Sequence, residues 1–98
     1  MSNEREITTG SILCQSDDLL SSDLGTEKLM MSMERGRYFG VNEVGKIIHD
    51  RCDGKTTLGK IVDELVSEFE IGRQECEATV LQFSSQLVSE GLLRFPEP

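Results

Sequence analysis

The stretch that decides the fold runs from Lys28 to Ile48 and reads KLMMSMERGRYFGVNEVGKII. Its first half holds two apolar runs, at 28–33 and 37–41, on either side of a short connection that contains Gly36, a pattern typical of a β-hairpin. The spacing of apolar residues becomes helical after Asn42, where they recur at spacings of three and four. Asn42 itself is a good helix N-cap. The stretch therefore predicts a hairpin that leads directly into a helix.

Upstream of this stretch lies one more short apolar run, Ile12–Cys14, followed by the turn-forming residues 17–18 and 21–23. We therefore expect a three-stranded antiparallel β-meander between Ser11 and Val41, with strands at 12–14, 28–33 and 37–41. Residues 1–10 are polar and without periodicity, which predicts a flexible tail and leaves 11–98 as a single domain.

Downstream, three helices are predicted. The first begins at Asn42 and ends at Asp53-Gly54, and the second is capped by Thr56 or Thr57 and carries an amphipathic stripe from Leu58 to Phe69. A third helix is expected from about Arg73 to Glu90. Its predicted core face is formed by Cys76, Val80, Phe83 and Leu87. The fold class is therefore α+β and winged helix-turn-helix-like, a meander followed by three helices.

The charge of the chain narrows its possible partners. It has 98 residues and a net charge of −8, and the second and third helices are each about −2. Acidic helices repel phosphates, so nucleic acid and anionic membrane surfaces are disfavoured as partners, although a winged-helix DNA-binding transcription regulator stays open as the alternative. No apolar run approaches the length of a membrane span or signal peptide, which predicts a cytoplasmic protein.

Residues that could carry catalysis are few. Cys14, Cys52 and Cys76 form no CxxC pair, and His49 is the single histidine of the sequence. A zinc site needs about four ligands, and His49 with Cys52 supplies two. There is no glycine-rich phosphate loop and no activated serine. We therefore expect no enzymatic activity, no metal and no cofactor.

The sequence contains clearer candidates for a binding surface than for a catalytic site. The strand at 37–41 is the last of the meander, so its free backbone groups are available to an added strand, and Gly40 allows close approach. The preceding strand contributes adaptable methionines such as Met31. The hairpin is locally basic, which favours an acidic extended peptide. The residues expected to bind it are Lys28, Met31, Arg35, Arg37, Tyr38, Phe39, Gly40 and Val41.

One flank of the third helix is the second candidate wall. Leu81 and Val88 lie about 110–130° from the centre of the predicted core face, and Glu77 and Ser84 fall between them and the core. Two readings are open. These residues either pack beneath the sheet or the C-terminal segment, or they form the wall of a groove.

Several strings in a fixed order resemble the PqqD family of small winged-helix-like domains that recognise ribosomally made, post-translationally modified peptides. The resemblance spans roughly residues 24–95. It is carried by RYFGVNEVG at 37–45, RCDGKTT at 51–57, IVDEL at 61–65, VLQF at 80–83 and EGLL at 90–93. His49 departs from the pattern, because many relatives have a bulky aromatic or aliphatic residue there.

The resemblance implies a partner and a binding mode. In the family, the leader segment of a precursor peptide adds as an antiparallel strand beside the third strand and lies against the third helix. On this sequence those positions are 37–41 and the flank of Glu77, Leu81, Ser84 and Val88. The implied second partner is a leader protease of a lasso-peptide pathway or a radical S-adenosylmethionine enzyme. A dimerisation module that uses the same edge is a further alternative, and a monomer or weak dimer is expected.

Overall fold

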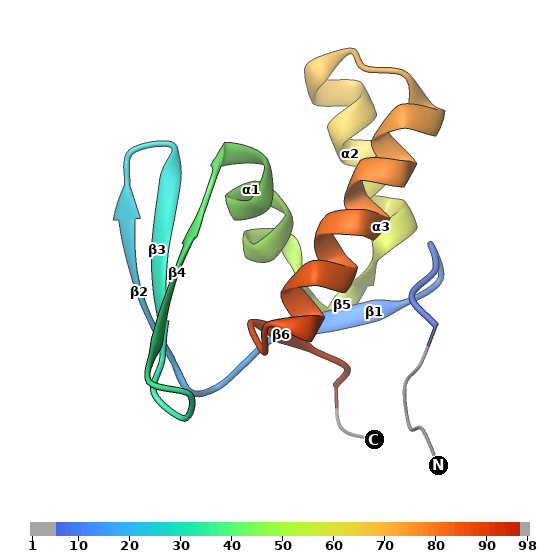
Figure 1. Cartoon of the computed structure of the whole chain (residues 1–98). Helices are drawn as coiled ribbons and strands as arrows, with labels where there is room; N and C mark the ends of the chain where they lie inside the picture. Colours follow the sequence, from blue (N-terminus) through green and yellow to red (C-terminus); the bar gives the residue numbers. More distant parts are fainter. Residues whose placement is uncertain (1–5, 97–98) are drawn as a thin grey trace.

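The computed structural model describes residues 6–96, which form two three-stranded antiparallel sheets and three helices (Figure 1). The sheet β2-β3-β4 stands to one side of the molecule, α1 lies between it and the pair α2 and α3, and the second sheet lies below the helices. The elements in chain order are β1 (Ile12–Gln15), β2 (Leu19–Leu24), β3 (Glu27–Ser32), β4 (Arg37–Val41), α1 (Glu43–Arg51), β5 (Asp53–Thr57), α2 (Leu58–Phe69), α3 (Arg73–Ser89) and β6 (Leu93–Arg94).

The meander is present, but its strands differ from those expected. It is formed by β2, β3 and β4, with Leu20 opposite Met31 and Met30 opposite Phe39. The prediction that residues 21–23 form a turn was wrong, because they lie inside β2, an edge strand with an almost fully exposed set of side chains. Polar residues such as Ser22 are tolerated there because pairing with β3, and not burial, holds the strand in place.

The predicted first strand belongs to a different sheet. β1 is the central strand of the order β5-β1-β6, in which Cys14 lies opposite both Asp53 and Arg94. Neither β5 nor β6 was predicted. Asp53 accepts hydrogen bonds from the backbone of Lys55 and Thr56, as in a turn, so the extended conformation of β5 becomes visible only through its pairing with β1.

The three helices lie where the sequence predicted them. Asn42 caps α1 by accepting a hydrogen bond from Gly45 N at 3.0 Å, and Thr57 caps α2 by accepting one from Lys60 N at 3.1 Å. α3 ends close to the expected residue, and Gly91 follows with a left-handed φ of 79°. One correction concerns the core face of α3, where Phe83 is only half-buried and Ser84 is fully buried.

The core lies between the three helices and the inner faces of the two sheets. Its fully buried side chains include Leu13 of β1, Met30 of β3, Ile48 of α1 and Ile61 of α2. Contacts with this core begin at Ile7, before the expected boundary at residue 11, and residues 1–5 of the predicted tail lie outside the described residues. None of the helices within residues 6–96 is long and apolar enough to span a bilayer.

Candidate functional site

A groove runs between β4 and α3. Its volume is about 330 Å³. The sheet order β2-β3-β4 leaves the outer edge of β4 without a partner strand among the described residues, and this edge forms one side of the groove. The residues that line it are Tyr38, Phe39, Gly40, Val41, Asn42, Phe83, Gln86, Leu87, Glu90 and Leu92.

The pleat of β4 decides which side chains face the helices. Phe39 lies opposite the buried Met30 and is half-buried, whereas Tyr38 is 69% exposed on the other face of the sheet. The guanidinium of Arg37 lies over the ring of Phe39, 5.2 Å from its centroid. The groove side of β4 is therefore apolar and has a positive charge at its first residue.

Gly45 brings the walls of the groove together. A Cβ atom at this buried glycine would lie 3.3 Å from Cβ of Val41 and 3.4 Å from the ring of Phe83. The absence of a side chain allows the end of β4, the first turn of α1 and the middle of α3 to meet at one point. The upper end of the groove is thus fixed by direct packing.

The side of α3 that faces β4 is not the predicted flank. Phe83 and Gln86 lie about 60° and 120° from the buried Val80 in one direction around the helix, whereas Leu81 lies about 100° in the other. Ser84 is fully buried in the core, and its hydroxyl has no hydrogen-bond partner among the described residues. Val88 lines a separate cleft. The four residues Glu77, Leu81, Ser84 and Val88 are absent from the lining of the groove.

Lys28 does not contribute to a basic surface. Its side chain is 8% exposed, and its ammonium group lies 2.6 Å from Oδ1 of Asp50 and 3.2 Å from Nδ1 of His49. Because an ammonium group can only donate, Nδ1 of His49 is the acceptor, and Nε2 donates to the carbonyl of Leu92 at 3.2 Å. This buried network joins β3, α1 and the segment after α3.

Burial dominates the electrostatics of the network. Burial lowers the pKa of His49, and the neighbouring Lys28 ammonium lowers it further. The imidazole is therefore held in its neutral form, in the tautomer with the proton on Nε2. His49 and Lys28 act as a structural cross-link beneath the groove, and Leu92, which accepts the hydrogen bond, is one of the residues that line the groove.

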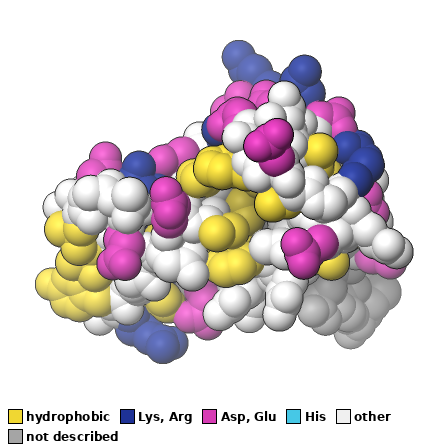
Figure 2. Space-filling model, turned by 90° about the horizontal axis from the view of Figure 1, so that it is seen from above, with side chains coloured by type: hydrophobic (Ala, Val, Ile, Leu, Met, Phe, Trp, Pro, Cys, Tyr) yellow, Lys and Arg dark blue, Asp and Glu magenta, His cyan; other side chains and the backbone are white. Residues whose placement is uncertain are grey.

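Apolar side chains are exposed on the outer face of the meander, away from the groove. Leu20, Leu24 and Tyr38 are each more than half exposed, and Met31 lies with Tyr38 and Leu20 in a shallow depression of about 220 Å³. Figure 2 shows hydrophobic side chains gathered on this sheet, at the left of the view. The predicted Met31 and the side chain of Tyr38 therefore belong to a surface separate from the groove.

The thiols and carboxylates of the described residues do not form a metal-binding cluster. Burial raises the pKa of Cys52 to about 12, so its thiol is protonated at neutral pH. The residues that the structure describes contain no group of three or more His, Cys, Asp or Glu side chains placed to hold a metal ion. The groove offers backbone hydrogen-bonding groups, apolar contacts and charge, which suit binding of an extended chain.

The fold is that of the small α+β domains represented by two solved structures. TbiB1 in complex with the TbiA(beta) leader peptide aligns with a TM-score of 0.76 at 25% identity and covers 87% of this chain and 99% of its own. Lasso peptide synthetase B1 complexed with the leader peptide aligns with a TM-score of 0.75 at 16% identity and covers 85% and 98% of the two chains.

The chain belongs to the PqqD family. Residues 27–93 match the family model described as coenzyme PQQ synthesis protein D. A PqqA binding protein from Xanthomonas oryzae pv. oryzae, strain PXO99A, is 31% identical over 58 residues, and the same figures hold for strain KACC10331. The match covers 59% of this chain and spans 63% of the length of these curated relatives. The family resemblance noted from the sequence is thereby confirmed.

Of the predicted site residues, the structure brings Phe39, Gly40 and Val41 to the groove, and Tyr38 borders both the groove and the outer-face depression. Arg37 stands beside it, through its contact with Phe39. Sequence reasoning missed Gln86 and Glu90 because they lie on the other side of the core stripe from the predicted flank, and it assigned Phe83 to the core. One signal was available for Phe83, since an aromatic residue at the border of the core stripe is often only partly buried.

Proposed function

We propose that this protein binds the leader segment of a ribosomally synthesised precursor peptide by strand addition at β4, against α3, and presents it to a maturation enzyme without catalysis of its own. The observation that carries the proposal is the uncovered edge of β4 in a groove lined by both apolar and polar side chains. An exposed strand edge templates an extended peptide through main-chain hydrogen bonds, and side-chain pockets beside it supply selectivity.

The roles divide along the groove. Backbone groups of residues 38–40 supply the ladder of hydrogen bonds, and Phe39, Phe83 and Leu87 supply apolar contacts. Arg37 supplies positive charge at one end. The apolar contacts assigned by resemblance to Leu81 and Val88 are transferred to Phe83 and Leu87, because these are the residues of α3 that face β4.

The comparisons support a peptide as the ligand. The curated relatives are PqqA binding proteins, and TbiB1, which shares the fold at 25% identity, is in complex with a leader peptide. We propose a lasso-peptide leader protease or a radical S-adenosylmethionine enzyme as the maturation partner. Tethering the precursor beside such an enzyme raises its local concentration. The three free cysteines suit a cytoplasmic location, where thiols stay reduced.

The alternative of a DNA-binding regulator has weaker support. The alternative is motivated by the succession of a hairpin, β3–β4, and the helices α2 and α3 along the chain, but both helices are acidic. Retention on duplex DNA that weakens with salt would favour this alternative.

Two glutamines of α3 give a matched test of the groove. Gln86 and Gln82 are both exposed and one helical turn apart, and only Gln86 lines the groove. The probe is the leader segment of the precursor encoded beside the gene, titrated by calorimetry. Gln86→Trp fills the groove and should abolish binding, whereas Gln82→Trp should leave it unchanged. Equal affinity of the two variants would overturn the groove assignment, and a leader that does not bind the wild type would overturn the proposed function.

A further inference from the structure

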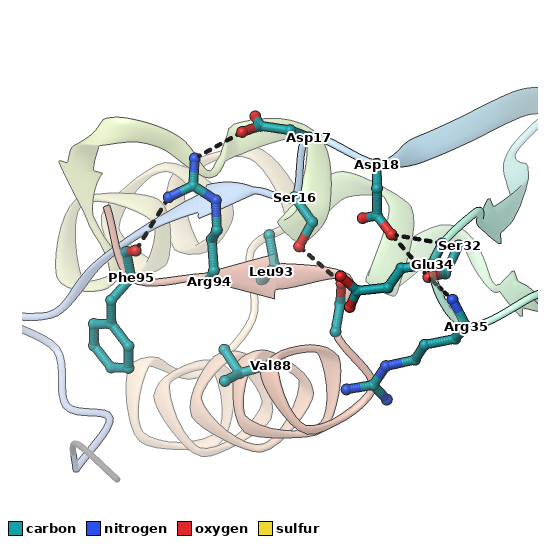
Figure 3. A pocket seen from close by; sticks show the side chains of 11 residues that line it. Ser16, Asp17, Asp18, Ser32, Glu34, Arg35, Val88, Leu93, Arg94 and Phe95 are labelled. Atoms are coloured by element: carbon teal, nitrogen blue, oxygen red, sulfur yellow. Dashed lines mark hydrogen bonds and ion pairs between the residues drawn. The ribbon is translucent and has the colours of Figure 1, made fainter. Parts of the chain in front are cut away.

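A second cleft lies just beyond the lower end of the groove. It has a volume of about 490 Å³ and opens at the turn between β3 and β4 (Figure 3). Val88, Leu93 and Phe95 give it an apolar floor, and Glu34 and Arg35 of the turn stand at its rim. Nothing in the binding mode proposed above uses this cleft.

Arg35 separates the cleft from the groove. Its side chain reaches from the turn to the carbonyl of Ser89, with Nη1 3.5 Å from that oxygen. A Cβ atom at Gly91 would lie 3.0 Å from the guanidinium, so Arg35 packs directly on the backbone after α3. Leu87 and Glu90 line the groove on one side, and Val88 and Gly91 line the cleft on the other. Neighbouring residues of the same segment thus line the two hollows, and Arg35 lies against this segment at the edge of the cleft.

The direction of an added strand determines which part of a peptide reaches the cleft. A peptide antiparallel to β4 passes Val41 first and Arg37 last. Each further residue advances it by about 3.4 Å, so the residues that come next pass the turn at Arg35.

Of the two arginines that line the cleft, Arg94 has a salt bridge to Asp17, and Arg35 has none among the described residues. Asp18 accepts hydrogen bonds from the Ser32 hydroxyl at 3.0 Å and from the Glu34 backbone at 3.1 Å, and Arg94 pairs with Asp17 at 3.3 Å. The hydrogen bond from the Glu34 backbone does most to lower the pKa of Asp18, and the charge of Arg35 contributes. No carboxylate oxygen of the described residues lies within 4 Å of the Arg35 guanidinium, whose hydrogen bond to Ser89 is long and reaches a neutral carbonyl. A guanidinium binds a carboxylate, often through two hydrogen bonds, more strongly than it binds a carbonyl.

We propose that this cleft is a second subsite for the same peptide and takes the residues that follow the segment added to β4. A peptide Asp or Glu pairs with Arg35, which leaves Ser89, and a neighbouring apolar side chain packs over Val88 and Leu93. Glu34 opposes this carboxylate. Its side chain points into the cleft and has no partner among the described residues (Figure 3). The inference rests on the proposed function, because it requires a peptide on β4.

The two adjacent residues of the turn should have opposite effects on affinity. With the leader segment of the precursor encoded beside the gene as probe, Arg35→Gln should raise the dissociation constant about 1.5- to 5-fold, the range for an exposed charged pair. Glu34→Gln should lower it by a factor of about two, because it removes a like charge. Both effects should vanish with a leader in which the Asp and Glu after the added segment are changed to Asn and Gln.

Every other outcome would contradict either the second subsite or the proposed function. If the neutral leader is equally sensitive to Arg35→Gln, Arg35 acts only by holding α3, and the subsite is overturned. The same holds if both variants bind like the wild type, or if the leader has no acidic residue after the added segment. Failure of the wild type to bind any leader overturns the proposed function instead. Urea unfolding of Arg35→Gln checks that the fold is intact.

Discussion

His49 should give the folded state a pH dependence near neutrality. The imidazole is 1% exposed, and its Nδ1 accepts from the Lys28 ammonium at 3.2 Å. Protonation would place an N–H group against that ammonium, so the folded state resists it, and burial lowers the pKa of His49 below its ordinary value. The unfolded chain has no such constraint and takes up the proton at a pKa of about 6.5.

The sign and size of the pH dependence follow from the difference in the pKa of His49 between the folded and unfolded states. The stability contributed by neutral His49 is fully present above pH 6.5 and is lost as the pH falls, because the unfolded state then binds more protons. A single proton changes the free energy of unfolding by at most about 1.4 kcal/mol per pH unit. Between pH 7.5 and 5.5 the limit is also about 1.4 kcal/mol, since half of this range lies above the unfolded pKa.

The assay is urea unfolding at a series of pH values between 5.5 and 7.5, a range in which ordinary carboxylates stay ionised in both states. His49→Gln keeps a donor and an acceptor but cannot titrate, so its free energy of unfolding should be nearly flat over this range. Lys28→Met keeps His49 and removes the neighbouring charge, so its slope should be smaller than that of the wild type. Parallel slopes for the wild type and His49→Gln would refute the reasoning, as would a histidine Cε1–H resonance that titrates near pH 6.5 in the folded protein.

Three further substitutions test the fold, with urea unfolding as the measurement. Met30→Ala should cost about 2–4 kcal/mol, because Met30 is fully buried in the core, and a loss below about 1 kcal/mol would contradict that burial. Asn42→Ala removes the cap of α1 and should cost about 1 kcal/mol, whereas Asn42→Asp should be nearly neutral. Gly91→Ala would place a Cβ atom at a left-handed φ of 79° and 3.0 Å from the Arg35 guanidinium, so it should cost about 1 kcal/mol or more. Truncation of Arg35 to Ala should restore part of this loss.

The sequence was sufficient for elements whose signal is local. Asn42 and Thr57 are caps followed at once by an apolar period, and both begin helices. The hairpin of β3 and β4 has a glycine turn, and Gly36 adopts a left-handed φ of 63°. Strands β5 and β6 lack such signals. Each is extended because β1 lies beside it, and the five residues Asp53–Thr57 alone favour a turn.

The same distinction explains the candidate site. The apolar run at 37–41 after a glycine-containing connection was enough to predict an open strand, because the last strand of a meander is an edge. The wall opposite depends on how α3 crosses the sheet. Periodicity defined the buried stripe through Val80, but it contains no information on which flank of the stripe faces β4. That choice is made by packing of Phe83 against Gly45, a contact between residues far apart in the chain.

The burial of Lys28 shows the limit of reasoning from charge. A lysine in a hairpin that also carries Arg35 and Arg37 favoured a basic surface, whereas Lys28 pairs with Asp50 and His49 inside the fold. The positive charge of the hairpin is therefore confined to Arg35 and Arg37, one at each side of the point where an antiparallel peptide would leave β4. The two charges can be tested separately, because Arg37 stacks on Phe39 and Arg35 contacts Ser89.

An open strand edge also predicts how the free protein associates. The backbone groups of β4 that would pair with a peptide can equally pair with β4 of a second copy, and unprotected edges are known to self-associate. We therefore expect a monomer that forms a weak dimer at high concentration in sedimentation experiments. Because peptide and second copy compete for one edge, a saturating leader peptide should return the dimer to a one-to-one complex. A dimer that persists with the peptide bound would place the contact elsewhere, and the exposed Leu20 and Tyr38 on the outer face of the meander would then be the residues to replace.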